Sequence, residues 1–242
     1  MRKFYYDLHI HSCLSPCGDD ENTPNNIAGF ACLAELDVVA LTDHNTCRNC
    51  PAFFEAAQRY GIIPIAGMEL TTSEDIHVVC LFPDLDSAMR FDSYVDAHRI
   101  KIKNRPEFFG KQQILDGTDT VIGEEEYLLS NATDISVDST TELVRSFGGI
   151  CYPAHIDRDA NGIIAVLGTL PRDIGFTYFG LHDKEKLAEL ATEYGIPENR
   201  FLISSDAHCL ESIRDRENAL MLDVESTDPE EVRRALFDLL RS

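Results

Sequence analysis

Histidine and carboxylate side chains recur in this sequence at the points where apolar segments end. His9 and His11 close the segment DLHIH, and residues two apart on a strand point to the same side, so both imidazoles can face one metal ion. Imidazole and carboxylate together form a common ligand set for zinc, iron and manganese. The same residue types stand in or after later apolar runs, at His44, Glu69, His77, His155, Asp206 and His208. A lone histidine at a strand end is usually only hydrogen-bonded, but this repeated pattern predicts a metal site.

Apolar runs alternate with amphipathic stretches, and the alternation indicates which elements carry these residues. We expect strands at residues 4–10, 37–42, 62–66, 76–82, 150–154, 176–181, 201–204 and 220–224. We expect helices at residues 23–36, 51–60, 86–102, 138–147, 183–194 and from 228 to the end. Strands that alternate with helices predict a parallel α/β architecture, here a distorted (β/α)7 barrel. The carboxyl ends of barrel strands meet at one mouth, so the metal ligands should converge there.

One segment breaks this rhythm. Residues from about 99 to 138 carry a hairpin pattern, with its turn near Asp116-Gly117, in place of a further strand and helix. No linker rich in proline or serine separates the segment from the rest of the chain. We therefore predict a single domain over residues 1–242 with a small inserted subregion.

The net charge is strongly acidic, because 21 Lys and Arg stand against 42 Asp and Glu, which gives −21. Such a surface repels nucleic-acid backbones and anionic membranes, which argues against a general DNA-coating role. No apolar run approaches the roughly 18 residues of a membrane span. The N-terminus has no apolar h-region, so we expect a cytoplasmic protein without a secretory signal. The eight cysteines are then expected to be free thiols. Cys47-x-x-Cys50 is a weak zinc or redox pattern, and small packing residues are the preferred interpretation.

The order of the motifs is similar to that of a known family. DLHIHS, TDHN, GMEL, IHVV, PAH and SDAH stand in the same order as in the PHP (polymerase and histidinol phosphatase) domain, and the resemblance spans nearly the whole chain. It is closest to the stand-alone phosphoesterase branch, which includes 5′-to-3′ exonucleases and nucleotide phosphatases. The resemblance implies a distorted barrel of seven strands, two or three divalent metal ions (zinc, manganese or iron) at its mouth, and hydrolysis of phosphate esters.

The resemblance also implies a role for each ligand. The first metal would be held by His9, His11, Glu69 and Asp206, the second by His44, His208 and a loop acid, and the third by Glu69, His77 and His155. Family members commonly read S-D-G after the first motif, whereas this chain reads SPCGDD, so we predict Asp19 as the loop acid, with Asp20 as the alternative. Asp43 is expected either to orient a ligand without touching the metal or to cap a helix. His98 and His182 match no motif and stay outside the predicted metal set.

Two divalent ions about 3.5–4 Å apart can bridge a water and bring its pKa toward neutrality, and the hydroxide then attacks phosphorus. Arg158, three residues after His155, is a candidate phosphate ligand. In the basic stretch 98–105, Arg99 and Lys103 share a face if the stretch is helical, and they could then bind a nucleotide or a short strand. The alternatives are a surface arginine paired with Asp157 or Asp159 for Arg158, and a solvated helix face for Arg99 and Lys103. We predict a metal-dependent phosphoesterase that acts on a nucleotide or an oligonucleotide end, with no obligate protein partner.

Three other functions remain open at this point. The chain could be a histidinol-phosphatase-like enzyme that acts on a small molecule. It could be a C–N hydrolase of the amidohydrolase type, which also begins with H-x-H but usually bridges its metals with a lysine, where this chain offers Glu69. It could also be a non-catalytic, metal-stabilised module. Metal ligands determine the reaction type and not the leaving group, so the sequence does not select the substrate.

Overall fold

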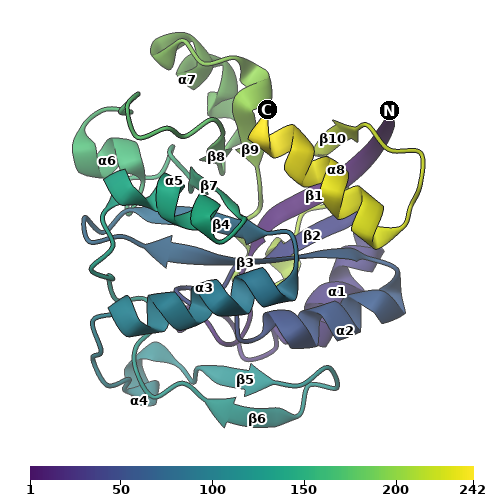
Figure 1. Cartoon of the computed structure of the whole chain (residues 1–242). Helices are drawn as coiled ribbons and strands as arrows, with labels where there is room; N and C mark the ends of the chain where they lie inside the picture. The colour runs from purple at the N-terminus through teal and green to yellow at the C-terminus, as the bar shows by residue number, and fades with distance from the viewer.

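The fold is built around a curled sheet of six strands, and the computed structural model describes all of residues 1–242 (Figure 1). The strands lie in the order β10-β1-β2-β3-β4-β7. Their bounds are Ala219–Leu222 for β10, Arg2–Ile10 for β1, Val38–Leu41 for β2, Ile63–Thr71 for β3, His77–Phe82 for β4 and Ile150–Pro153 for β7. β1, β2 and β3 are parallel neighbours, whereas β4 runs antiparallel to β3 and β7, and β10 runs antiparallel to β1.

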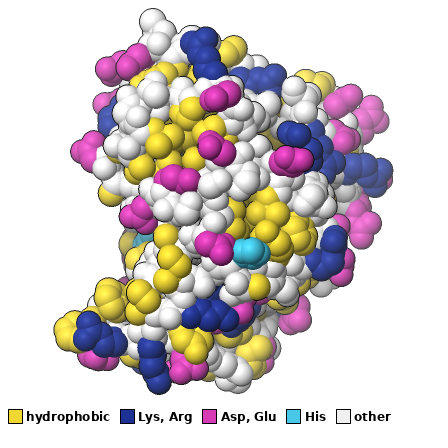
Figure 2. All heavy atoms as spheres, turned by 60° about the vertical axis from the view of Figure 1, so that its left-hand side comes forward, with side chains coloured by type: hydrophobic (Ala, Val, Ile, Leu, Met, Phe, Trp, Pro, Cys, Tyr) yellow, Lys and Arg dark blue, Asp and Glu magenta, His cyan; other side chains and the backbone are white.

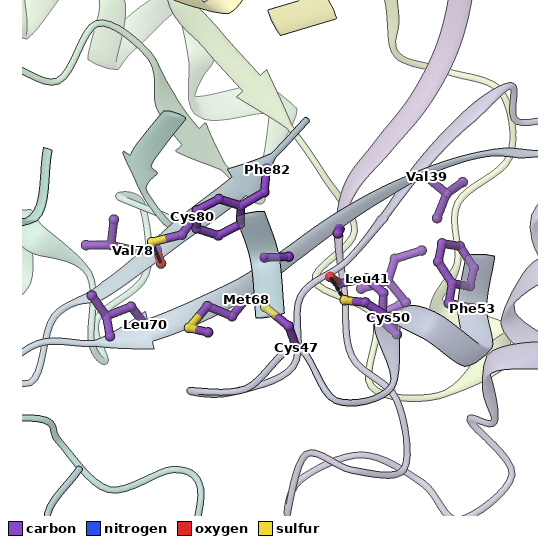
Figure 3. Close-up of a cluster of buried hydrophobic side chains, with 14 of the residues drawn as sticks. Val39, Leu41, Cys47, Cys50, Phe53, Met68, Leu70, Val78, Cys80 and Phe82 are labelled. Carbon is purple, nitrogen blue, oxygen red and sulfur yellow. Dashed lines mark hydrogen bonds between the residues drawn. The ribbon is translucent and has the colours of Figure 1, made fainter. Parts of the chain in front are cut away.

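Both faces of this sheet are buried. The helices are α1 (Pro24–Leu33), α2 (Cys50–Tyr60), α3 (Leu85–His98), α4 (Pro106–Phe109), α5 (Val137–Ser146), α6 (Ile163–Leu167), α7 (Leu187–Tyr194) and α8 (Pro229–Arg241), with 3₁₀ turns at Lys184–Lys186, Glu198–Arg200 and Leu210–Ser212. Val39 and Leu41 of β2 face the larger core, which α1, α2, α3 and α5 complete (Figure 3). Val38 and Ala40 face the smaller core, which α8 covers. Because a strand covered on both faces needs no polar side, β2 is the continuous apolar run VVAL.

The parallel pair of β8 (Phe179–Leu181) and β9 (Phe201–Ile203) continues the curl of the sheet. The remaining strands, β5 (Gln113–Leu115) and β6 (Val121–Glu124), pair with each other in the inserted subregion. The Ile156 N–H, just after β7, donates to the Gly180 carbonyl of β8 at 2.9 Å, and Ile10 of β1 forms an isolated parallel bridge with Ala207. No continuous ladder joins this pair to β7 or β1, so the sheet is a curled half-barrel.

Two sequence-based predictions about these elements are wrong. The sheet is mixed and not parallel throughout, because residues 72–76 join β3 to β4 with no helix between them and the two strands form an antiparallel hairpin. The helix predicted for residues 86–102 ends at His98, since Arg99 takes an extended conformation with φ −70° and ψ 141°. Arg99 and Lys103 therefore share no helix face. The hairpin predicted within the inserted subregion is confirmed as β5–β6. None of the helices combines the length and the apolar character needed to cross a bilayer.

Candidate metal centre

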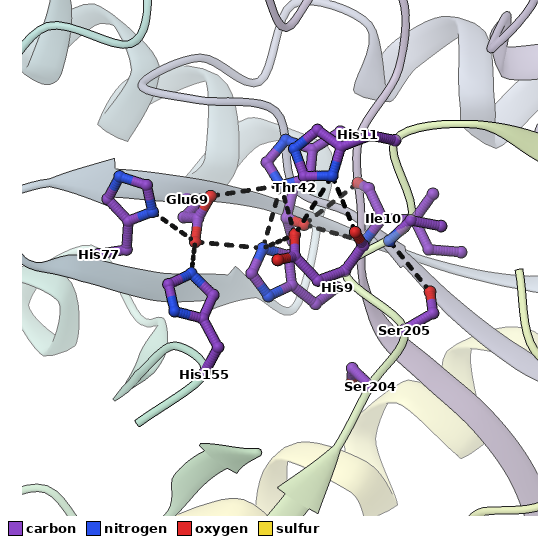
Figure 4. A network of polar contacts seen from close by, with 12 residues as sticks. His9, Ile10, His11, Thr42, Glu69, His77, His155, Ser204 and Ser205 are labelled. Carbon is purple, nitrogen blue, oxygen red and sulfur yellow. Dashed lines mark hydrogen bonds and ion pairs between the residues drawn. The ribbon is translucent and has the colours of Figure 1, made fainter. Parts of the chain in front are cut away.

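Glu69, on β3, lies at the centre of a buried cluster of imidazoles (Figure 4). Five histidine nitrogens lie within 3.3 Å of its carboxylate oxygens. Oε1 lies 3.3 Å from His9 Nε2, 3.0 Å from His77 Nδ1 and 3.0 Å from His155 Nε2, and Oε2 lies 3.2 Å from His11 Nε2 and 3.1 Å from His44 Nδ1. Segments separated by well over a hundred residues therefore meet at one carboxylate.

Strand direction explains why these side chains meet. His9 and His11 lie at and just past the end of β1, and their Nε2 atoms are 3.1 Å apart, as the two-residue spacing predicts. His44 follows β2 at the same edge of the sheet. His77 stands at the start of β4 and not at its end. Because β4 is antiparallel to β3, its amino end lies at the edge where the parallel strands finish, and His77 reaches the cluster from there.

Asp206, just after β9, is a second carboxylate that contacts His9 and His11. Its Oδ1 is 3.3 Å from His9 Nε2 and 3.2 Å from His11 Nε2. The ring of His208 stacks on that of His11, with centroids 4.2 Å apart. Ligand atoms within 4.8 Å of one another form three groups, which are His9–His11–Glu69–Asp206, His11–His44–His208 and His44–Glu69–His77. His155 contacts Glu69 but lies outside these three groups.

The cluster keeps its carboxylates ionised, whereas its histidines differ in pKa. Burial alone would raise the pKa of Glu69, but His77 and its neighbouring histidines hold that pKa well below its usual range. The pKa of Asp206 is also held low against the effect of burial, by the charge of His9. Burial lowers the pKa of His208 to about 4, whereas Asp206 and Glu69 overcome the effect of burial on His11 and raise its pKa well above the usual range. Because metal ions bind ionised carboxylates and neutral imidazoles, a cation that binds His11 would displace a proton from it.

Unpaired atoms in the cluster test this interpretation. His44 Nδ1, His77 Nδ1 and Asp206 Oδ1 are buried and lie 3.0–3.3 Å from other atoms of the cluster without a well-directed hydrogen bond, and His155 Nδ1 is buried with no partner. Each such atom costs about 1–3 kcal/mol unless a ligand satisfies it. All four are atoms of a metal-binding type, and imidazole with carboxylate suits zinc, iron or manganese. The residues present therefore fit divalent metal ions.

Asp43 positions a histidine of the cluster through a serine. Asp43 Oδ1 accepts hydrogen bonds from the Ser12 N–H and the Ser15 hydroxyl, and its Oδ2 accepts one from the Ser12 hydroxyl, each at 2.7 Å. Ser15 Oγ, with its proton directed at Asp43, accepts from His11 Nδ1 at 3.0 Å and from the His44 N–H at 3.2 Å. This network assigns the His11 proton to Nδ1 and leaves the Nε2 lone pair for a metal.

The predicted loop acids lie outside the cluster. Asp19 is exposed, and its carboxylate accepts the Glu21 N–H at 2.9 Å. Its backbone N–H donates to the His208 carbonyl at 2.8 Å, so only the main chain of Asp19 joins the metal loops. Asp20 is exposed and lies 3.8 Å from Lys111 Nζ. Neither carboxylate belongs to the three ligand groups.

A basic edge borders the cluster at Asp206. Arg158 Nη1 lies 2.6 Å from Asp206 Oδ2, and Arg158 Nη2 lies 3.4 Å from His182 Nδ1. Arg214 donates to the His182 carbonyl at 2.8 Å. Sequence reasoning missed His182 and Arg214. His182 directly follows the predicted strand 176–181, so the strand-end rule that found the other histidines also applied to it, whereas nothing in the sequence marks Arg214.

The other two predicted substrate ligands lie in different surroundings. The guanidinium of Arg99 is buried, with Nη2 at 2.6 Å from Asp96 Oδ1 and 3.1 Å from Glu125 Oε1. Lys103 is exposed, and its Nζ lies 3.3 Å from Glu126 Oε1. Arg99 is thus engaged in holding the fold together, and of the two only Lys103 presents its charge to solvent.

The eight cysteines are free thiols, as predicted. Cys47 and Cys50 are buried in the larger core, where both thiols donate to the Gly67 carbonyl, at 3.2 and 3.5 Å (Figure 3). Burial and the neighbouring Cys50 raise the pKa of Cys47 well above its ordinary value. A thiol that stays protonated is a poor nucleophile and a poor metal ligand, which agrees with a packing role.

Comparison with known proteins supports the arrangement of the cluster. The family described as "PHP domain" matches residues 7–146, which is more than half of the chain. The chain belongs to the PHP domain family. The match covers the elements that carry His9, His11, His44, Glu69 and His77, so the family's first motifs coincide with most of the cluster.

Solved structures share the fold of this PHP domain. The lesion-specific endonuclease PfuEndoQ from Pyrococcus furiosus aligns with a TM-score of 0.67 and 18% identity, over 98% of this chain and 56% of its own. Endonuclease Q in complex with a 27-mer duplex substrate that carries an abasic lesion aligns with the same TM-score, at 17% identity. A candidate metal-dependent phosphoesterase from Bifidobacterium adolescentis aligns with a TM-score of 0.55 and 17% identity, over 96% of this chain and 95% of its own.

A curated relative matches part of the chain. Uncharacterized protein MJ1587 from Methanocaldococcus jannaschii is 33% identical over 88 residues, which is 33% of this chain and 51% of the relative. The match therefore spans about half the length of that relative.

Proposed function

We propose that this PHP domain is a metal-dependent phosphoesterase that hydrolyses a phosphate ester of a nucleotide or of a nucleic-acid end. The observation that carries the proposal is the convergence of five imidazoles on Glu69, with Asp206 beside two of them. The structural neighbours support it, since one is an endonuclease solved with DNA and another is named as a phosphoesterase.

In this proposal each member of the cluster binds a divalent ion or orients a residue that does. The ions would be held by His9, His11, Glu69 and Asp206, by His44 and His208, and by Glu69, His77 and His155. When bound, such ions act as Lewis acids toward water and the phosphoryl group. Glu69 contacts ligands from several strands, so it would bridge neighbouring ions. Asp43 would act as a positioning residue that keeps His11 in the required tautomer.

Arg158 is proposed to bind the substrate phosphate. Its side chain is 39% exposed while Nη1 contacts the buried Asp206, so the guanidinium extends from the cluster to solvent. Arg214 lies on the same edge through its bond to His182. Guanidinium groups bind phosphate oxygens in a bidentate manner, so Arg158 and Arg214 offer this edge two cationic donors in a chain whose net charge is −21.

The central ligand argues against the amidohydrolase interpretation, although an amidohydrolase from Chromobacterium violaceum shares the fold with a TM-score of 0.59 and 18% identity. That interpretation expects a lysine between the metals, whereas Glu69 occupies the central position, within 3.3 Å of five histidine nitrogens. Amide substrates assayed beside phosphate esters separate the two reactions. Histidinol phosphate belongs in the same panel, and a non-catalytic module would turn over none of these substrates.

The test compares two histidine substitutions. His9 lies in the cluster, whereas His98 lies on the surface and pairs with Asp134 at 2.7 Å, which makes His98→Ala a matched control. We expect His9→Ala to lower bound metal, measured by elemental analysis, and to lower turnover of nucleotides and labelled oligonucleotides by at least about 100-fold. His98→Ala should change neither quantity.

Metal removal gives a readout independent of turnover. EDTA should abolish activity, and Mn²⁺ or Zn²⁺ should restore it. Metal at 100 times its Kd should stabilise the metal-free protein by about 2.7 kcal/mol, seen as a higher melting temperature. Full metal content and full turnover in His9→Ala would overturn the proposed function.

A further inference from the structure

The segment after α3 has an exposed surface whose chemistry differs from that of the rest of the molecule. Residues 99–111 contain five Lys or Arg and one Glu, in a chain of net charge −21. Phe108 and Phe109 project from the same segment and are 69% and 42% exposed. We refer to the exposed side chains of this segment as the insertion surface, which comprises Lys101, Lys103, Arg105, Phe108, Phe109 and Lys111. The view in Figure 2 is turned about the vertical axis, so the inserted subregion stays at the bottom, where hydrophobic and basic side chains lie together.

The insertion surface adjoins the loop that follows the first metal-binding motif. Gly110, directly after Phe109, lies so close to this loop that a Cβ at Gly110 would be 3.2 Å from the Pro16 carbonyl oxygen. The Gln113 N–H donates to the Cys13 carbonyl at 3.3 Å. The exposed phenylalanines are therefore carried on a segment attached to the residues immediately after His11.

The inserted subregion also contacts the second metal-binding loop. Asn45, the residue after His44, donates through Nδ2 to the Leu129 carbonyl at 2.7 Å and to the Asn131 carbonyl at 2.8 Å. The subregion is therefore attached to both of the loops that follow metal-binding histidines.

A partly buried ionic network also holds the subregion in place. Arg99 pairs with Asp96 at 2.6 Å and with Glu125 at 3.1 Å, and Arg48 of the α2 loop pairs with the same Glu125. These pairs tie the subregion to the body of the domain. The surface side chains beyond them are therefore held at a defined position relative to the mouth.

The charges of the insertion surface remain available to a partner. Lys101, Lys103 and Lys111 each face one carboxylate, at 3.0, 3.3 and 3.8 Å, and such exposed pairs are weak. Arg105 forms no ion pair, and its guanidinium lies 4.8 Å from the centroid of the Phe108 ring. Exposed aromatic rings beside cations are the arrangement with which proteins stack bases and contact phosphates of single strands.

We propose that the insertion surface binds a single-stranded stretch of nucleic acid, with bases stacked on Phe108 and Phe109 and phosphates near the basic side chains. The proposal rests on the proposed function, and it narrows the substrate to a strand in place of a free nucleotide. A protein partner would account for the exposed apolar rings, but it would leave unexplained why an unpaired guanidinium and three weakly paired ammonium groups stand beside them in an acidic chain. A polyanion with aromatic bases accounts for both.

The test measures binding without cleavage. Fluorescence anisotropy of a labelled single strand of about 12 nucleotides is followed with His9→Ala protein, or with the unmodified protein in EDTA. We expect Phe108→Ala/Phe109→Ala to raise the Kd about tenfold or more, which corresponds to the loss of one or two stacked bases. Arg105→Gln should lower the slope of log Kd against log salt by about 0.7, because one phosphate contact is lost.

The control is Phe30→Ala/Leu33→Ala, which removes two exposed apolar side chains of α1 and should leave the Kd unchanged. Circular dichroism and melting temperature confirm that each variant is folded. An unchanged Kd in the phenylalanine variant, or binding to anionic vesicles in place of the strand, would overturn the inference. Strand binding without any turnover by the unmodified protein would instead refute the proposed function and leave the insertion surface as inferred.

Discussion

Asp43→Asn replaces one carboxylate oxygen with an amide nitrogen in the network behind the metal cluster. Asp43 accepts three hydrogen bonds of 2.7 Å, two from Ser12 and one from Ser15. If the amide oxygen takes the place of Oδ1, the two bonds made there survive and the amide nitrogen faces the Ser12 hydroxyl. The Ser12 hydroxyl oxygen already accepts from the Leu14 N–H at 3.2 Å and from Asn49 Nδ2 at 3.0 Å. The Ser12 hydroxyl proton therefore loses its acceptor, and the hydroxyl and the new amide N–H face each other as two donors.

The magnitude follows from these contacts. A buried polar group left unsatisfied costs about 1–3 kcal/mol, and we expect the free energy of unfolding to fall by that amount. The neutral amide oxygen is also a weaker acceptor than a carboxylate, so the Ser15 hydroxyl would be held less firmly and would orient His11 Nδ1 and the His44 N–H less well. Residues that orient a metal-binding histidine are worth about 10- to 100-fold in metal affinity. The Kd for Mn²⁺ should rise by that factor, or about 1.4–2.7 kcal/mol.

Calorimetric titration of Mn²⁺ into metal-free protein measures this effect, and ¹H–¹⁵N NMR reports the tautomer of His11. Asp92→Asn is the matched control. Asp92 is also a buried carboxylate, and its Oδ1 accepts from the Thr46 hydroxyl and the Cys47 N–H, each at 2.7 Å. The control should lose stability without losing metal affinity, since Asp92 contacts no histidine of the cluster.

A second pair of variants separates positioning from simple destabilisation. Ser15→Ala removes the intermediary and should reproduce the loss in metal affinity, whereas Ser15→Thr keeps the hydroxyl and should retain most of the affinity. If Asp43→Asn and Asp92→Asn bound Mn²⁺ equally well, with the His11 proton still on Nδ1, the reasoning about tautomer control would be refuted.

Two further predictions concern stability. Gly67→Ala should lower the free energy of unfolding in urea by about 1–3 kcal/mol, because the new Cβ would lie 2.7 Å from the backbone oxygen of Cys80. Gly29→Ala in α1 meets only ordinary contacts at 3.5 Å and should raise that free energy by about 0.5–1 kcal/mol. Equal urea midpoints for the two variants would contradict this reasoning. Burial would raise the pKa of Glu74, but the Val137 N–H at the start of α5 donates to its carboxylate at 2.9 Å, and the net effect is a lowered pKa. Glu74 therefore contributes about 0.3–1 kcal/mol to the free energy of unfolding above its unfolded pKa, and this contribution is lost as the pH falls. Glu74→Gln should remove that part of the acid-limb slope, and an unaltered slope would count against it.

Local patterns in the sequence were sufficient to identify most of the cluster and the elements that carry it. His9 and His11 face the same way because alternation is a property of a single strand. Thr23 and Asp228 begin two of the predicted helices, and each side chain caps its helix by accepting a backbone N–H within three residues. The apolar run of β2 is covered on both faces by the two cores. Each of these signals depends on neighbours along the chain.

The tertiary structure alone decided which distant groups meet. The antiparallel turn into β4 brings His77 to the mouth, a fact that depends on strand direction and not on strand content. Arg99 pairs with the buried Glu125 and the half-buried Asp96, although its sequence context resembles a solvent-facing basic strip. Asp19 directs its backbone to His208 and its carboxylate to solvent. The link from Asp43 through Ser15 to a ligand joins two loops, and no local pattern encodes such a contact, because its geometry is set by the packing of segments that lie far apart in the chain.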